Sequence, residues 1–224
     1  QGEALLEEHL TGPELSADVL ISDATVYVLP PADRIIVSGP RFIELGHSLP
    51  SCLSPKILGA IKPLATQLVS GLDLTWGVIK LDLLVEGTQP VVIEMAGRLS
   101  GGRNSAVTIP LHSGINATAL ALKLALGERL DKDDITPSRS DGVVKRILLP
   151  EPGRVEAVEG IPDVLSWPGV YDVFAGVKPG ELIPVIKSNV DRMFHIITVA
   201  KTRCKAERIA ERALAKIKVT TSSL

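Results

Sequence analysis

Short apolar stretches separated by turn-forming residues fill the chain up to Leu49. The clearest two flank Ser22-Asp23-Ala24, a triplet typical of a hairpin turn. Prolines and glycines, as in Gly39-Pro40, separate the others. The pattern predicts strands at Ala4–Leu6, Asp18–Ile21, Thr25–Leu29, Arg34–Val37 and Phe42–Leu45.

A helical pattern follows this region. Apolar residues recur at helical spacing over Ile57–Val69. Ser54 is suited to cap the helix, Pro55 fits its first position and Gly71 ends it. Pro63 lies inside the pattern, which predicts either a kink or a later start at that residue.

Two strongly apolar stretches come next, Val78–Val85 and Val91–Met95. The short polar link Glu86–Pro90 makes a hairpin the simplest interpretation. A glycine-rich loop, Gly97–Gly102, follows the second strand, and Ile115–Leu126 is an Ala/Leu-rich stretch that predicts a helix.

A polar segment from Leu130 to Asp141 predicts a boundary between two domains, residues 1–130 and 141–224. In the second domain, strands are predicted at Val143–Leu149, Val155–Val158, Val170–Phe174, Ile183–Ile186 and Ile196–Ala200. Ala206–Ile217 predicts an amphipathic helix. The expected fold is therefore α+β, with an antiparallel sheet and helices first and a small antiparallel sheet packed on one helix afterwards.

Composition narrows the range of functions. A net charge of −2 over 224 residues provides no electrostatic basis for binding nucleic acid or an anionic membrane. No apolar run approaches the roughly 20 residues that span a bilayer, and no signal peptide is visible. Cys52 and Cys204 occur without a CxxC or a Cys/His spacing typical of zinc, so we expect two free thiols in a reducing cytoplasm.

Two carboxylates interrupt the apolar hairpin, because Asp82 and Glu94 each lie between two apolar neighbours. A buried carboxylate is costly unless it is paired or binds a metal. On adjacent antiparallel strands the two acids could face the same side, where a cation between them would relieve their repulsion. Mg²⁺ prefers such oxygen ligands together with substrate phosphates. The alternative is two half-exposed acids beside a solvated loop.

The loop after Glu94 also favours an anion site. Arg98 provides a planar fork of donors, and Gly101 and Gly102 allow the backbone to approach a ligand closely. Together with the two acids, this loop predicts a site for Mg²⁺ and phosphate.

These residues resemble a known family. The segments Trp76–Asp82 and Val91–Gly102 look like the signature of the ATP-grasp superfamily, in which two acids on adjacent strands hold the Mg²⁺ of ATP. The resemblance implies that Asp82 and Glu94 are metal ligands. It also implies that the catalytic contacts to phosphate or acyl-phosphate come from Arg98, Gly101 and Gly102. Ala96 departs from the pattern, because many members have Asn there as a third metal ligand.

Two further segments extend the resemblance. The segment Leu5–Glu14 is similar to the ATP-grasp hinge, which implies that the nucleotide is lined by Glu7, Glu8, His9, Leu10 and Glu14. Without the motif at Trp76–Asp82 and Val91–Gly102, these residues would be interpreted as an exposed polar loop. His47 lies in a Gly-His-x-x-Pro-Ser segment similar to one in the amino-acid-ligase-like group, which implies a substrate contact. The region after Asp141 looks like the C-terminal domain of that group, which overlaps with carbamoyl-phosphate-synthase large-chain-like proteins.

The resemblance implies an ATP- and Mg²⁺-dependent ligase that forms an acyl-phosphate from a carboxylate and joins it to an amine. Its expected partners are small-molecule substrates and the N-terminal half of the same enzyme, or a partner chain; a homodimer is also an expectation. Because the chain starts at the hinge-like segment, we expect the fragment alone to hold one wall of the ATP site and to be inactive. Three alternatives remain open: a bicarbonate acceptor, a thiol acceptor, and a non-catalytic nucleotide-binding module.

Overall fold

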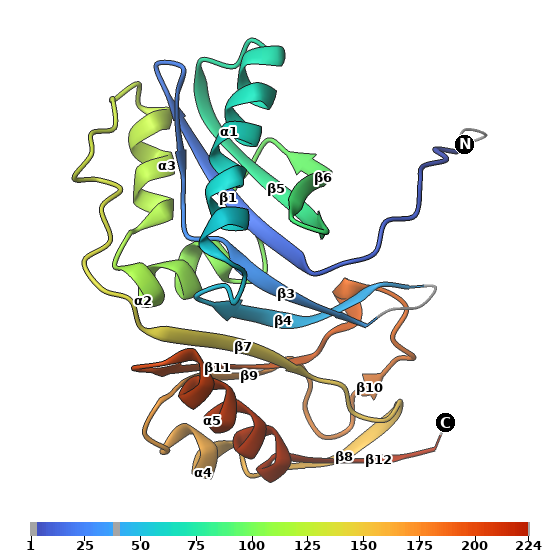
Figure 1. Cartoon of the computed structure of the whole chain (residues 1–224). Coiled ribbons are helices and arrows are strands. Elements are labelled where there is room, and N and C mark those ends of the chain that lie inside the picture. The colour runs from blue at the N-terminus through green and yellow to red at the C-terminus, as the bar shows by residue number, and fades with distance from the viewer. Residues whose placement is uncertain (1–3, 38–40, 224) are drawn as a thin grey trace.

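The computed structural model describes residues 4–37 and 41–223 as a mixed α+β protein with two antiparallel sheets (Figure 1). The large sheet contains β1 (Glu14–Ser22), β2 (Thr25–Val28), β3 (Ala32–Val37), β4 (Ile43–Leu49), β5 (Trp76–Glu86), β6 (Gln89–Ala96), β7 (Gly142–Leu148), β9 (Val170–Ala175) and β11 (Phe194–Ala200). The small sheet contains β8 (Gly153–Glu159), β10 (Leu182–Ile183) and β12 (Lys218–Ser222). The α-helices are α1 (Pro55–Gly71), α2 (Ile109–Ser113), α3 (Ala117–Ala125), α4 (Ile161–Leu165) and α5 (Arg203–Lys216), and the other helical turns are η1 (Asn104–Thr108) and η2 (Asn189–Asp191).

The strand order of the large sheet is β6-β5-β1-β3-β4-β7-β11-β9, with β2 paired to β1. Strand β4 pairs with β7, so the sheet runs without a break from the first part of the chain into the second (Figure 1). The division into domains at residues 130–141 stays a prediction, but the two parts share this sheet.

Helix α1 covers one face of β1 and β5. Successive side chains of a strand point to opposite faces, and the odd-numbered residues from Leu15 to Ile21 and from Ile79 to Val85 pack in one buried cluster with α1. The even-numbered residues on the other face include Ser16, Asp18 and Asp82. The alternation therefore places polar side chains on the face opposite α1.

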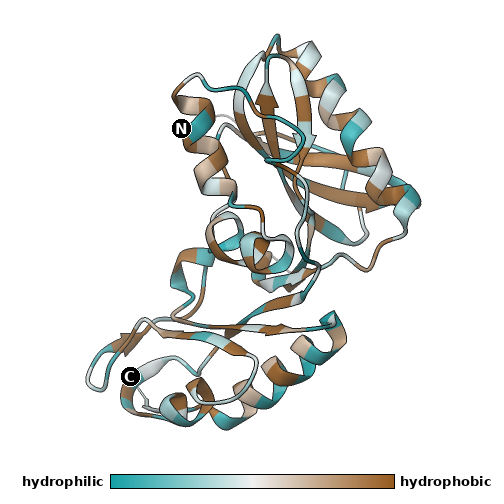
Figure 2. Cartoon of the chain, turned by 90° about the vertical axis from the view of Figure 1, so that its left-hand side faces the viewer, coloured by the Kyte–Doolittle hydropathy of each residue, from teal (hydrophilic) through white to brown (hydrophobic). Residues whose placement is uncertain are grey.

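Two further clusters complete the core. Helices α2 and α3 pack over Leu20, Leu49 and Ile197. Helix α5 buries Ala206, Ala210 and Ala213 against β7 and β11, and small residues let it approach those strands closely. Figure 2 shows apolar residues concentrated on the strands, while α5 carries both apolar and hydrophilic residues, as its amphipathic pattern predicts.

Several predicted elements are confirmed. The first hairpin forms as β1 and β2, and the second as β5 and β6. Ser54 caps α1 by accepting a hydrogen bond from the backbone N–H of Ile57. Helix α1 begins at Pro55 and is continuous across Pro63, so the alternative of a later start is wrong.

Other predictions need correction. The strand at Ala4–Leu6 is wrong: residues 4–13 form no helix or strand and run away from the body of the molecule (Figure 1). Leu5 is 83% and Leu6 97% exposed, because no strand lies beside them to bury them. The strand predicted at Phe42–Leu45 instead spans Ile43–Leu49 and includes His47. The Gly39-Pro40 turn lies outside the described residues.

The second part of the chain also differs from expectation. Three of its strands, β7, β9 and β11, extend the large sheet instead of forming a separate one. The strand predicted at Ile183–Ile186 shortens to the two residues of β10. Helices α2 and α4, the π-helical turn η1 and strand β12 were not predicted. In the part of the chain that the structure describes, no helix is long and apolar enough to cross a bilayer.

Candidate active site

The two predicted carboxylates are direct neighbours in the sheet. Asp82 on β5 is the register partner of Glu94 on β6, and Ser16 on β1 lies opposite Asp82 on its other side. Cross-strand partners point to the same face of a sheet. The three side chains therefore form a polar row on the face opposite α1.

Asp82 is 2% exposed. Its Oδ2 accepts hydrogen bonds from Lys80 Nζ at 2.5 Å and lies 3.1 Å from Arg34 Nη1. Its Oδ1 is buried and has no partner among the described residues. A buried carboxylate oxygen without a partner is costly, and a divalent cation would satisfy it. Glu94 is exposed to the same cavity.

The pair fits Mg²⁺ by the chemistry of its donors. Mg²⁺ is usually held by one or two carboxylates plus substrate phosphates rather than by a complete protein cage. The described residues contain no cluster of three or more acids, histidines or cysteines arranged to hold a metal ion.

Arg34 on β3 joins three carboxylates. Its Nη1 lies 3.0 Å from Glu14 and 3.1 Å from Asp82, and its Nε lies 3.3 Å from Glu44. Burial raises the pKa of Glu14, with Asp82 and Glu44 adding to the rise, although Arg34 lowers it in part. Arg34 is therefore the cation that allows three acids to stand close together.

A β-bulge places Glu44 and His47 on the same face. Residues three apart in a regular strand point to opposite faces, but the register between β3 and β4 shifts by one residue at this point. Gly46 lies in the bulge with a positive φ, and a Cβ there would come within 2.0 Å of the Lys145 carbonyl oxygen of β7. Only glycine fits this approach of the two strands.

Glu44 is ionised within a network of cations. His47 Nε2 lies 3.4 Å from its carboxylate, and Arg192 Nη1 lies 3.0 Å away. Burial favours the neutral acid, but the hydrogen bond and charge of His47 and the charges of Arg192 and Arg34 prevail and hold the pKa of Glu44 well below its usual range. His47 is 4% exposed, and its Nδ1 has no partner among the described residues.

Asp18 on β1 anchors the glycine-rich loop. One carboxylate oxygen accepts hydrogen bonds from the Ser100 backbone N–H and hydroxyl, each at 2.7 Å. The other accepts one from the Ser105 hydroxyl at 2.6 Å. The N–H groups of Gly101 and Gly102 form no hydrogen bond within the described part of the chain, and both residues line the cavity. The loop thus presents free N–H donors from a fixed base.

Replacing Asp18 with Ala is expected to destabilise the protein by about 3 kcal/mol, because three donors to a buried charged group lose their acceptor. Urea unfolding measures this effect. The matched control is Asp133→Ala, which removes an exposed aspartate whose side chain forms no hydrogen bond or ion pair with the described residues and should change stability little. Equal losses in both variants would contradict the anchoring role of Asp18.

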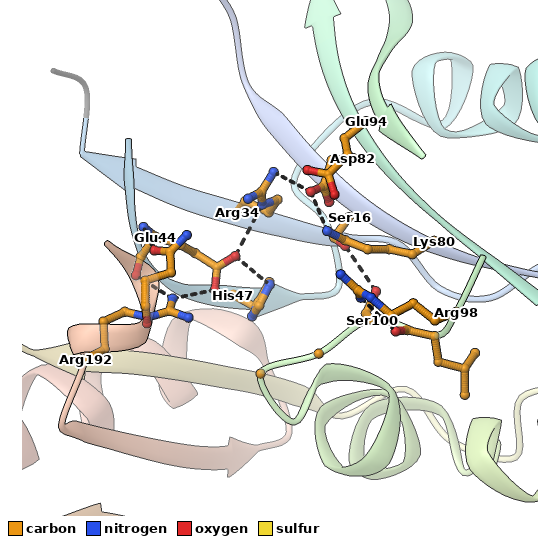
Figure 3. Close-up of a pocket in the computed structure, with 14 residues that line it drawn as sticks. Ser16, Arg34, Glu44, His47, Lys80, Asp82, Glu94, Arg98, Ser100 and Arg192 are labelled. Carbon is orange, nitrogen blue, oxygen red and sulfur yellow. Dashed lines mark hydrogen bonds and ion pairs between the residues drawn. The ribbon is translucent and has the colours of Figure 1, made fainter. Parts of the chain in front are cut away.

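The predicted site residues line two adjoining cavities. Asp82, Glu94, Arg98, Gly101, Gly102 and His47 line one cavity of about 440 Å³, whose charged residues are drawn in Figure 3. Glu7, Glu8, His9, Leu10 and Glu14 line a second cavity of about 590 Å³. Arg34, Asp82 and Glu94 line both cavities. The structure thus brings the hinge-like segment and the acidic pair together, although the hinge-like segment is not a strand.

Several residues of the site were missed. Arg34, Lys80 and Arg192 line the first cavity, and Asp18 holds its loop. A charged residue between apolar neighbours was the signal that identified Asp82, and Lys80 and Asp18 carry a similar one in their strands. Arg192 lies in a segment without a recognisable pattern.

Comparisons with known proteins support the fold. Residues 146–222 match the family model of the L-amino acid ligase C-terminal domain 2. The L-amino acid ligase from Bacillus licheniformis superposes with a TM-score of 0.80 at 23% identity, covering 95% of this chain and 52% of that protein. Phosphoribosylglycinamide synthetase from Anaerococcus prevotii superposes with a TM-score of 0.82 at 15% identity, covering 96% and 55%.

A curated relative, the uncharacterized protein y4rH of Sinorhizobium fredii, is 26% identical over 225 residues, which are 96% of this chain and 44% of that protein. The chain thus spans about half the length of the proteins it matches.

Proposed function

We propose that this chain, which has the fold of the C-terminal half of the ATP-grasp ligases, contributes to an active site that activates a carboxylate as an acyl-phosphate and joins it to an amine. One observation carries the proposal: Asp82 offers a buried oxygen that has no partner among the described residues, beside Glu94 and at the boundary between two cavities. The likeness of residues 146–222 to the L-amino acid ligase domain supports an amino acid or peptide-type substrate.

The second cavity suits the nucleotide. Apolar side chains, among them Ile36, Phe42 and Leu84, line it together with polar residues of the segment 7–14. An adenine ring would lie against the apolar part, and Glu7, Glu8, His9, Leu10 and Glu14 would contact the nucleoside. The phosphates would then extend past Arg34 and Asp82 into the first cavity.

Asp82 and Glu94 would hold Mg²⁺, which neutralises phosphate charge and orients the phosphates when bound. Lys80 and Arg98 add positive charge at the wall of the first cavity. The N–H groups of Gly101 and Gly102 would donate to the oxygens of the acyl-phosphate. This arrangement promotes phosphoryl transfer by positioning and electrostatic stabilisation, without a protein nucleophile.

The first cavity indicates the class of substrate. Leu99 is its single apolar lining side chain within the described residues. Arg34, Lys80 and Arg192 are paired with carboxylates of the lining, and Arg98 is the lining cation without an ion pair among the described residues. An apolar pocket would reject a small charged substrate, whereas this lining favours one. We therefore propose a small polar carboxylate as the group that is phosphorylated, with His47 as a substrate contact.

We further propose that the complete enzyme includes a second half, on the same or a partner chain, that closes over the nucleotide. A homodimer and a cytoplasmic location are part of the same proposal. The principal alternative is bicarbonate or a thiol as acceptor in place of the amine.

The test is ADP release by the longest protein that the gene encodes. We expect ADP only when Mg²⁺, a carboxylate and an amine are all present, and mass spectrometry should then find the amide product. Assays of ADP release with panels of amino acids, small carboxylates, bicarbonate and coenzyme A distinguish between the possible acceptors. ADP release that requires bicarbonate or a thiol in place of the amine would show that this compound is the acceptor. Nucleotide binding without any turnover would favour the non-catalytic module.

A further inference from the structure

Lys145 lies at the centre of the large sheet behind the glycine-rich loop. It is on β7, its register partner on β4 is His47, and it is 3% exposed. Its Nζ donates a hydrogen bond to the Gly102 carbonyl oxygen at 2.7 Å. No carboxylate of the described residues lies within ion-pair distance of this ammonium. A buried lysine normally requires a partner, and here that partner is the backbone of the loop.

We propose that Lys145 is a positioning residue of this site, whose ammonium group holds the Gly101-Gly102 turn in place at the wall of the cavity, where its N–H groups have no hydrogen-bond partner among the described residues. The expected effect of Lys145 on catalysis rests on the proposed ligase function. Its expected effect on the conformation of the loop does not. No motif in the sequence indicated Lys145.

The loop is held from both sides. Asp18 on β1 fixes its start through Ser100, and Lys145 on β7 fixes Gly102. Gly102 has a φ of +61°, and the following Arg103 also has a positive φ and forms an ion pair with Asp172 on β9. Two successive positive φ values are uncommon outside glycine, so the turn needs such external contacts to keep its shape.

The pKa of Lys145 also lies closer to neutral pH than that of an ordinary lysine. Burial lowers its pKa to about 8; Glu44 opposes the fall, and Arg192 and Arg103 add to it. Burial, together with Lys145 and Arg103, lowers the pKa of His195 to about 4, so that ring is neutral when Lys145 titrates. The charged and titratable groups around Lys145 are Glu44 and His47 on β4, Arg103 in the loop, Asp172 on β9, Arg192 after η2 and His195 on β11.

The sign of the pH effect follows from this. Below about pH 8 the ammonium donates a charge-assisted hydrogen bond to Gly102, which is about twice as strong as a neutral one. Above that pH the neutral amine donates more weakly. The loop should therefore loosen as the pH rises through 8.

An NMR titration of the wild-type protein tests the structural part without ATP or turnover. We expect the Lys145 side-chain resonance to titrate near pH 8 and the Gly102 and Arg103 amide resonances to follow the same curve. Titration near the ordinary lysine pKa, or loop amides that do not follow it, would overturn the proposal. Ligase activity that survives such a result would leave the proposed function intact.

Variants separate charge from hydrogen bonding. Lys145→Gln keeps a donor but no titratable charge, Lys145→Met removes both, and Lys56→Gln, at an exposed position of α1, is the control. We expect exchange of the Asn104 amide, which donates to the Gly101 carbonyl oxygen, to rise roughly tenfold in Lys145→Met, less in Lys145→Gln, and not in the control. Unchanged exchange in Lys145→Met would refute the positioning role; if that variant does not fold, the wild-type titration still decides.

In the active enzyme, kcat should fall by up to about 100-fold in Lys145→Met, as expected for a misplacement of about 1 Å, while KM for ATP changes little. The wild-type kcat should decline above about pH 8, and this limb should be absent in Lys145→Gln. A decline of the same shape in both proteins would overturn the catalytic part of the proposal.

Discussion

Replacing Asp82 with Asn and Glu94 with Gln together is expected to abolish ADP formation by the complete enzyme. Metal charge contributes several kcal/mol to phosphoryl transfer, and each 1.4 kcal/mol changes the rate tenfold, so the loss should be at least about 1,000-fold. The substitutions keep side-chain volume, and the remaining amide oxygen of residue 82 can still accept from Lys80 and Arg34. A coupled assay of ADP release measures the effect.

A matched control is Glu86→Gln, which neutralises an exposed acid at the end of β5, away from the cavities. Its activity should equal that of the wild type. Calorimetric titration with Mg²⁺-ATP adds a second readout, in which the double variant should lose the Mg²⁺ dependence of nucleotide binding. Full turnover by the double variant would sink the assignment of these acids as metal ligands.

The largest expected effect on stability comes from Arg34→Met. This change keeps an unbranched side chain but removes the cation that Glu14, Glu44 and Asp82 share. Breaking a buried ion pair by removing one partner costs about 3–5 kcal/mol. Urea unfolding at pH 7 measures the change in the free energy of unfolding.

The pH dependence of this loss has a definite sign. The pKa of Glu14 is already raised by burial, and removal of Arg34 would raise it further. Carboxylates that have lost their cation become neutral as the pH falls. The loss of unfolding free energy in the variant, relative to the wild type, should therefore become smaller toward acidic pH. Arg129→Met breaks an exposed ion pair with Asp23 and should leave stability unchanged. If Arg34→Met lost no more unfolding free energy than Arg129→Met, the central role of Arg34 would be contradicted.

The acidic pair was predictable because Asp82 and Glu94 break otherwise apolar strands, and their hairpin is local. The roles of Arg34 and Asp18 were not predictable, although Asp18 also lies between apolar neighbours. Their importance depends on partners elsewhere in the chain, such as Ser100 for Asp18. Side-chain pairing between distant strands is set by register, which the pattern along one strand does not specify.

Two errors have similar causes. The strand predicted at Ala4–Leu6 had the right composition but no neighbouring strand to complete its hydrogen bonds. The prediction of one small separate sheet was wrong because β7 pairs with the edge of β4 and so extends the large sheet. The bulge at Gly46, which turns Glu44 and His47 to the same face, depends on the register between β3 and β4 and cannot be predicted from a local pattern.

The close approach at Gly46 has a consequence for motion. Because the backbones of β4 and β7 meet there without room for a side chain, the seam between the two parts of the chain is a continuous hydrogen-bonded ladder. Tilting one part against the other would break that ladder before it widened the cavity. We therefore expect the sheet beneath the site to move as one rigid unit, and we expect the movement that admits substrate in segments outside the sheet, such as residues 4–13.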